Sequence, residues 1–376
     1  MPGLTLTNFR PIGFEGAVAS SLHIGADGKL VAAPEPGAET IDCKGSWLSP
    51  GWADLHVHVW HGGTDISVRA DQGGLQRGVT AMADAGSAGE ANFHGLREYV
   101  LDKQPETIRA FLNIGSIGLV ACNRVSELID MRSIDVDRTL AVIEANRDVV
   151  CGIKVRASGV IVGAWGITPL KIGKRVAEIA GLPVMVHVGE MPPTLDEVLA
   201  VLTPGDVVTH CFNGKQGGSI ADTPALMDLA KRLAAQGVLM DIGHGAASFS
   251  FRVARQAIGE GLKPHSISTD LHLRNVHGPV YDMATTVSKV LAAGLPFEDC
   301  MTAITAHPRK FLKLGSQAAP GVRADFTLFD VVDCDETVFD SGGDSMRLEK
   351  MIEPRLTFLG NHRVEASRAK PEGSPA

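Results

Sequence analysis

The sequence predicts an α/β protein: a (β/α)8 TIM barrel with a small β-sandwich domain built from both termini. Eight apolar runs of strand length alternate with longer helical patterns between residues 51 and 314. That length suits a (β/α)8 barrel, which takes about 250 residues. Short alternating segments and turns occupy both ends of the chain. No GxGxxG motif follows a predicted strand, which disfavours the doubly wound open sheet.

The predicted barrel strands are short runs rich in β-branched residues, as in parallel strands buried on both faces. After a first strand that ends at His58, they cover residues 78–84, 108–114, 149–155, 182–187, 206–210, 238–242 and 265–270. Predicted helices include residues 170–180, 224–236, 251–258 and 299–314, and glycine follows each of the first three as a stop signal.

The domain boundaries follow from where this alternation begins and ends. Residues 51–314 form the predicted barrel, and residues 1–50 with 315–376 form the predicted β-sandwich. Short strands and polar turns are expected in the C-terminal part, and residues from about 364 on are expected to fray. The two flanks can share one domain because the ends of a domain often lie close together.

The composition is that of an ordinary globular protein, with 44% hydrophobic and 21% charged residues. A net charge of −8 argues against nucleic-acid binding, which needs basic surfaces. The first ten residues lack a signal-peptide pattern, and no apolar stretch reaches the ~18 residues of a membrane span. The six cysteines show no CxxC spacing, which favours a reducing compartment. We therefore expect a cytoplasmic protein with no nucleic-acid or membrane partner, and a homo-oligomer is compatible with the sequence.

Side chains that bind metals lie at the carboxyl ends of the predicted strands, where a barrel gathers its active site. Period two places the first two histidines on one face of their strand, so both imidazoles can bind one ion. The intervals between the others match one or two strand–helix units. The set consists of His56, His58, Lys154, His187, His210 and Asp270.

Each of these residues also has a structural explanation. A lysine at a strand end can extend to solvent, a lone histidine is more often structural than a ligand, and an aspartate after a strand often caps a helix. Those explanations would have to hold for six residues at once. A shared site for divalent metal ions is the simpler interpretation, because imidazole and carboxylate suit Zn2+ and similar ions.

The sequence resembles the amidohydrolase superfamily in its binuclear form. Residues 50–58 (PGWADLHVH) match the family's first-strand motif, and residues 152–158 (GIKVRAS) match its strand-four lysine motif. Residues 321–330 are similar to the family's return strand into the β-sandwich. The resemblance spans almost the whole chain, and its motifs are more specific in combination than singly.

The resemblance implies two divalent metal ions, with Zn2+ as the expected metal, and a hydrolase of amide or ester bonds. It implies that Lys154 is carbamylated by CO2 and bridges both ions. Asp270 would be the catalytic residue, first as general base and then as general acid. A hydroxide shared by the two ions would attack the carbonyl. The implied ligand sets are His56, His58 and Asp270 for one ion and His187 and His210 for the other.

The substrate class follows from a departure from one branch of the family. Within the superfamily the chain is similar to the dihydroorotase-like amidohydrolase and deacetylase group. Dihydroorotases usually carry an arginine two residues after the second strand-one histidine, and here that position is Trp60. We therefore predict a deacetylase that acts on the C–N or ester bond of N-acetyl or O-acetyl derivatives of α-amino or α-hydroxy acids.

A carboxylate substrate of this kind needs a cationic partner. Arg156 is one candidate, with a salt bridge in the barrel wall as the alternative, and Arg274 is another, with a solvated loop charge as the alternative. His244 is expected to face the pocket, because glycines on both sides suit a close approach of backbone or ligand. The remaining candidates for lining the site are His272, Asn213 and Tyr281.

Three other functions stay open. These are a cyclic amidohydrolase such as a dihydroorotase, a zinc deaminase on the same barrel, and a non-catalytic barrel subunit. Deaminases of this superfamily usually use one metal and lack the strand-four lysine, so Lys154 disfavours the second. A non-catalytic subunit should lack some ligands, and all six are present.

Overall fold

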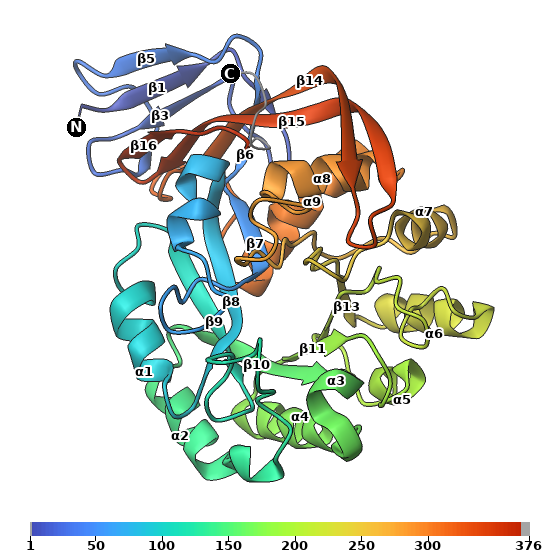
Figure 1. Cartoon of the computed structure of the whole chain (residues 1–376). Helices are drawn as coiled ribbons and strands as arrows, with labels where there is room; N and C mark the ends of the chain where they lie inside the picture. The colour runs from blue at the N-terminus through green and yellow to red at the C-terminus, as the bar shows by residue number, and fades with distance from the viewer. Residues whose placement is uncertain (1, 370–376) are drawn as a thin grey trace.

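The structure is a computed structural model that describes residues 2–369. A parallel sheet curls into a barrel with helices on its outer side, and two further sheets lie beside it (Figure 1). This architecture confirms the predicted fold class. The barrel strands follow one another in sequence order: β7 (Trp52–Val57), β8 (Val79–Gly89), β9 (Thr107–Asn113), β10 (Val150–Ala157), β11 (Val184–Val188), β12 (Val207–Thr209) and β13 (Leu239–Asp241).

The eighth predicted strand closes the barrel without forming a regular strand. Isolated parallel bridges join Ser266 to Asp241 on one side and Leu271 to Val57 on the other. The backbone of Asp270 has a φ of +50°, a left-handed conformation that interrupts strand geometry at this point. The segment therefore lies where the eighth strand was predicted, but it is joined to its two neighbours only by isolated β-bridges.

Three of the predicted helices are confirmed, and the fourth is wrong as a single helix. The predicted 299–314 helix is split at Thr305, whose φ and ψ of −123° and −93° are not helical. Gly259 lies inside the third helix, whereas Gly181 has a φ of +66° and ends its helix as expected. The helices are α1 (Phe93–Leu96), α2 (Val136–Ala145), α3 (Gly159–Val162), α4 (Thr168–Ala180), α5 (Leu195–Leu199), α6 (Pro224–Ala235), α7 (Phe251–Gly259), α8 (Met283–Ala292), α9 (Phe297–Ile304) and α10 (Ala306–Phe311).

The second layer of the molecule combines strands from both ends of the chain. A four-stranded sheet has the order β4-β3-β1-β5, and a five-stranded sheet has the order β16-β15-β14-β6-β2. Leu6 and Leu22 of the first sheet pack with Leu48, Phe326 and Phe358 of the second in one buried core. The strands are β1 (Leu4–Thr7), β2 (Arg10–Pro11), β3 (Ser21–Ile24), β4 (Leu30–Val31), β5 (Glu39–Asp42), β6 (Trp47–Pro50), β14 (Asp325–Phe339), β15 (Ser345–Leu359) and β16 (His362–Glu365).

The C-terminal part differs from the short strands that the sequence predicted. Strands β14 and β15 are 15 residues each and form one long hairpin. Its outer end leaves the sandwich and reaches α7 (Figure 1), where the Phe251 amide donates to Asp340 Oδ2 at 3.0 Å. The middle of β15 packs on α8, where the Ile352 amide donates to Ser288 Oγ at 3.0 Å. The prediction of fraying is wrong for residues 364–369, because Arg368 is buried and pairs with Glu336 and Glu353. The rest of that predicted tail lies outside the described residues.

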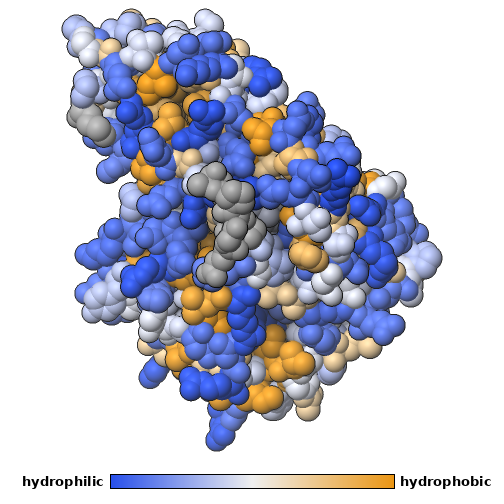
Figure 2. Space-filling view, turned by 45° about the horizontal axis from the view of Figure 1, so that its top comes forward, coloured by the Kyte–Doolittle hydropathy of each residue, from blue (hydrophilic) through white to orange (hydrophobic). Residues whose placement is uncertain are grey.

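Three further features concern the surface, the helices and the cysteines. Hydrophilic residues predominate on the face in Figure 2, and apolar side chains there form separate groups. No helix within residues 2–369 is long and apolar enough to cross a membrane. All six cysteines lie in this part of the chain and are free.

Candidate active site

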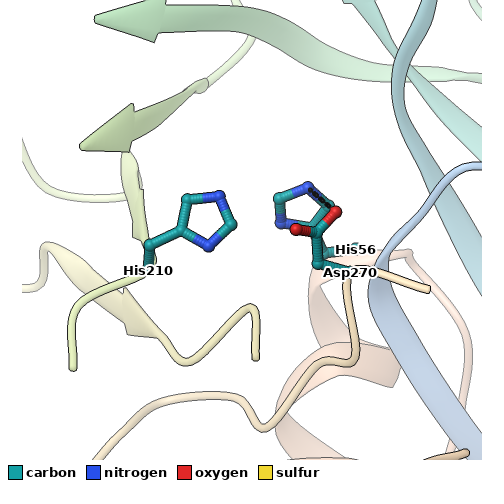
Figure 3. Close-up of side chains that lie close together, drawn as sticks. All are labelled: His56, His210 and Asp270. Carbon is teal, nitrogen blue, oxygen red and sulfur yellow. Dashed lines mark ion pairs between the residues drawn. The ribbon is translucent and has the colours of Figure 1, made fainter. Parts of the chain in front are cut away.

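Side chains from the carboxyl ends of five barrel segments meet in one cavity of about 470 Å³. Ligand atoms of His56, His210 and Asp270 all lie within 4.8 Å of one another, and Figure 3 shows the three side chains directed toward a common centre. The structure brings all six predicted ligands to this cavity: His56, His58, Lys154, His187, His210 and Asp270.

The cluster divides into two neighbouring groups. Asp270 Oδ1 lies 3.3 Å from His56 Nε2 and 3.2 Å from His58 Nε2. The His187 ring packs edge-on against the His210 ring, with centroids 4.4 Å apart. The His56 and His210 rings are 5.1 Å apart and connect the groups. One carboxylate and four imidazoles therefore face each other over a short distance.

Hydrogen bonds select the tautomer of two histidines. The Thr209 hydroxyl donates to Asp241 Oδ2 at 2.7 Å, so it must accept the proton of His56 Nδ1, 2.8 Å away. The carbonyl of Gly243 can only accept, and His210 Nδ1 donates to it at 2.7 Å. In both rings Nε2 is therefore unprotonated and free to bind a metal ion.

A hydroxyl that donates to a buried carboxylate also orients His58. Ser87 Oγ lies 3.1 Å from His58 Nδ1 and donates to Asp84 Oδ2 at 2.8 Å. The serine is therefore the acceptor for the imidazole. Buried carboxylates behind two of the three rings fix their orientation, which is typical of metal-binding histidines.

Lys154 is buried in the middle of the cluster without an acidic partner. Its Nζ lies 3.1 Å from His56 Nε2 and 3.4 Å from Met185 Sδ, and it forms no salt bridge within residues 2–369. Burial lowers the pKa of Lys154 to about 7. Gly86, with a φ of +88°, leaves room for it, because a Cβ there would lie 2.7 Å from the lysine's own Cβ. An amine that loses its proton more easily than usual and has no acidic partner in the described residues fits conversion into an anionic metal ligand.

Two of the ligand candidates have left-handed backbones, at a φ of +67° for His210 and +50° for Asp270. Such conformations are uncommon outside glycine and cluster at functional sites. An asparagine holds each of them. Asn213 Nδ2 donates to the His210 carbonyl at 3.0 Å, and Asn275 Nδ2 donates to the Asp270 carbonyl at 2.7 Å. Asn213, which was predicted to line the site, does not line the cavity and supports the backbone behind it.

Asp270 is held in its charged form. Burial raises the pKa of this carboxyl, but positive charge beside it, first that of a protonated His56 ring, places the pKa well below its ordinary value. With the Nε2 atoms of both His56 and His58 unprotonated, a bound metal ion would supply that charge instead. A charged carboxylate at the centre of the cluster can bind a metal ion or accept a proton.

Three of the six predicted substrate residues line the cavity: Arg156, His272 and Arg274. Both carboxylate oxygens of Glu127 bind Arg156, at 2.7 Å to Nε and 2.8 Å to Nη2. Arg156 therefore forms the salt bridge in the barrel wall that was the alternative to substrate binding. Arg274 is exposed and forms no salt bridge in the described part of the chain.

The structure places two of the predicted substrate residues outside the cavity. His244 is fully buried and stacks on Phe249 at 4.6 Å, outside the cavity. The glycines at 243 and 245 have positive φ values, and the turns they form direct the imidazole away from the cavity. Tyr281 also has a positive φ, and its hydroxyl lies against Gly278 rather than in the cavity.

Sequence reasoning missed an ion pair on the cavity wall. Lys215 Nζ lies 2.9 Å from Glu190 Oε1, and Ser158 Oγ donates to Glu190 Oε2 at 2.5 Å. Glu190 and Lys215 both line the cavity. They follow predicted strands five and six by a few residues, so the rule that loops after barrel strands form the site could have found them.

We predict that Thr209→Val weakens metal binding at His56. Valine keeps the shape of threonine but cannot accept the Nδ1 proton, so the ring loses its orientation. Loss of such a partner lowers metal affinity by about 10- to 100-fold. Competition with a chelator, followed by metal analysis, measures the change. Thr209→Ser is the matched control, because it keeps the hydroxyl, and wild-type affinity in the valine variant would show that the hydrogen bond is dispensable.

Comparisons with known proteins identify the family. No family model matches the chain. A deacetylase of Agrobacterium fabrum is 54% identical over 98% of this chain and 93% of its own length. A deacetylase of Brucella anthropi is 52% identical over 98% of this chain and 94% of its own length.

Solved structures with a similar fold support the same relationship. A crystal structure described as a dihydroorotase has a TM-score of 0.96 and 50% identity, covering 99% of this chain and 100% of the other. One described as an adenine deaminase has a TM-score of 0.88 and 33% identity, covering 97% and 100%. The chain belongs to the amidohydrolase superfamily, as predicted. It is a hydrolytic enzyme of that superfamily, and its nearly full-length relatives are named deacetylases.

Proposed function

We propose that the chain is a binuclear metal-dependent deacetylase of N-acetyl α-amino acids or O-acetyl α-hydroxy acids. The observation that carries the proposal is the cluster of four imidazoles and one carboxylate around Lys154, in which all side chains except the half-buried His187 are buried. The names of the relatives support acetyl removal.

The donor set fits two divalent ions, with Zn2+ as the expected metal. The buried amine of Lys154, which has no acidic partner in the described residues, fits the carbamate that would bridge the ions. Bound ions would polarise the acetyl carbonyl and lower the pKa of a water molecule. The residues that would hold them are His56, His58 and Asp270 for one ion, His187 and His210 for the other, and Lys154 for both.

Asp270 supplies the proton chemistry of the proposed reaction. Its charged carboxylate accepts a proton from the attacking water. It then donates that proton to the nitrogen or oxygen that leaves the acetyl carbon. Water is consumed, and the products are acetate and the free amino or hydroxy acid.

Arg274 is the best placed cation for the substrate carboxylate. It lines the cavity, is exposed and has no acidic partner in the described part of the chain. Three other cations line the same cavity, but each already has an acidic partner: Arg124 pairs with Asp65, Arg156 with Glu127 and Lys215 with Glu190. A guanidinium without a partner can bind a carboxylate with two parallel hydrogen bonds.

A dihydroorotase is the second candidate, because a structure of that description is 50% identical. The position of the substrate-gripping arginine is Trp60 here, and its indole packs over Gly63 and Gly95 rather than lining the cavity. A cyclic substrate would therefore lack that cationic contact.

The test is a chiral substrate panel with zinc-loaded protein. It contains N-acetyl-D- and N-acetyl-L-amino acids, O-acetyl-(R)- and O-acetyl-(S)-2-hydroxy acids, and dihydroorotate. We expect acetate release from one enantiomer of an acetylated acid. Turnover of dihydroorotate alone would replace the proposal by the second candidate.

A further inference from the structure

We propose that Lys289 is a positioning residue for the hydrolytic site and acts through His244 and the loop after β13. The inference rests on the proposed function for its catalytic consequence. Lys289 lies on α8, is fully buried and belongs neither to the cavity nor to the metal cluster. Burial of an ammonium is unfavourable unless its donors are hydrogen-bonded, so a lysine in this position is expected to have specific partners.

Lys289 Nζ has three acceptors from three separate segments of the chain. It donates to the Pro279 carbonyl at 2.5 Å and to the Phe339 carbonyl at 2.7 Å, and it lies 3.1 Å from His244 Nε2. Three acceptors match the three donors of an ammonium. Lys289 therefore joins the loop that follows Asp270, the end of the β14–β15 hairpin and the loop after β13.

The contact fixes the tautomer of His244. Its Nε2 accepts from the lysine, so Nδ1 carries the proton and donates to the Gly245 carbonyl at 3.0 Å. Ser341, at the hairpin tip, forms two further hydrogen bonds to the loop. Its Oγ donates to the Gly245 carbonyl at 2.9 Å and accepts from the Phe249 amide at 3.2 Å. The hairpin tip lies close to β13 and α7 in Figure 1. The imidazole and the serine together hold the loop of residues 243–250.

This loop touches the catalytic cluster directly. A Cβ on Gly245 would lie 2.5 Å from Asp270 Oδ2, so the backbone packs against the carboxylate that moves the proton. Gly243 accepts the proton of His210 Nδ1. Residues 246–248 form part of the cavity wall. A loosened loop would displace both Asp270 and His210 relative to the substrate, although no atom of Lys289 reaches them.

The test compares Lys289→Met with Lys174→Met in the full-length, metal-loaded protein. Lys174 is a second buried lysine, on α4, and its amine pairs with Asp206 just before β12, away from the cavity. Both variants lose a buried amine, so both are expected to melt at a lower temperature. Only Lys289→Met is expected to lower kcat, by about tenfold or more, with KM unchanged, because misplacement of catalytic groups acts on the transition state.

Hydrogen exchange gives a readout that does not depend on activity. In Lys289→Met, amides of residues 243–251 should exchange faster while those of β9 keep their protection, whereas Lys174→Met should leave residues 243–251 as in the wild type. Unchanged local exchange in Lys289→Met, or faster local exchange with wild-type kcat, would overturn the proposal. If Lys289→Met does not fold, Ser341→Ala should show the same local exchange and a smaller loss of kcat, and wild-type values would overturn it.

The two proposals fail in distinguishable ways. A wild-type protein that hydrolyses no acetylated acid overturns the proposed function, and hydrogen exchange still decides whether Lys289 holds the loop. An active wild type with an equally active Lys289→Met variant overturns only the positioning role.

Discussion

Replacement of Lys154 by methionine is expected to lower hydrolysis strongly and to remove one of the two metal ions that we propose. Methionine fills the buried space of the lysine but cannot form a carbamate, so the bridging anion that we propose cannot form. Loss of one ion from a two-metal site removes several kcal/mol of transition-state stabilisation, and we expect kcat/KM to fall by about 10²- to 10³-fold or more. Elemental analysis of the metal content per chain, alongside acetate release, measures both effects.

Lys174→Met is the matched control for this experiment, because it removes a buried lysine that pairs with Asp206 outside the cavity. It should keep two ions and wild-type kcat even where it lowers the melting temperature. A Lys154→Met variant that keeps two ions and full activity would show that the lysine does not bridge.

Asp270→Asn is expected to lower kcat by about 10²- to 10⁴-fold, the contribution of a positioned general acid–base. Asparagine keeps the shape of the side chain but cannot accept the proton of the attacking water. Steady-state kinetics at saturating metal measures the loss, so that weaker metal binding is not mistaken for lost proton transfer.

Asp282→Asn is the control for this variant. Asp282 is a buried carboxylate that does not line the cavity, and its Oδ1 caps α8 by accepting from the Thr285 amide at 2.8 Å. The Asp282→Asn variant should be less stable than the wild type and should keep the wild-type kcat. Equal activity of Asp270→Asn and the wild type would mean that another group moves the proton.

The sequence predicted the barrel and the ligand cluster because both depend on short-range patterns. Apolar runs locate the strands, and parallel strands bring their carboxyl ends together. His56 and Asp270 are far apart in sequence, yet the strand pattern alone was enough to expect them to be neighbours. The left-handed backbones at His210 and Asp270 were not foreseen, because each depends on a single positive φ.

The features that sequence could not give are long-range or depend on single backbone angles. Nothing local indicates that Glu127, in an irregular loop, binds Arg156 and removes it from the free cations. The turns at Gly243 and Gly245 point His244 out of the cavity, although the strand pattern pointed it inward. The length of the β14–β15 hairpin depends on its packing against the barrel as well as on its own alternation.

A metal titration of acetate release is the most direct test of the binuclear deacetylase. Metal-free protein is titrated with Zn2+ in bicarbonate, and acetate release from the best acetylated acid is followed at each addition. We predict that activity rises to a plateau at two equivalents of Zn2+ per chain. A plateau at one equivalent, or full activity in the presence of a chelator, would exclude a two-metal mechanism.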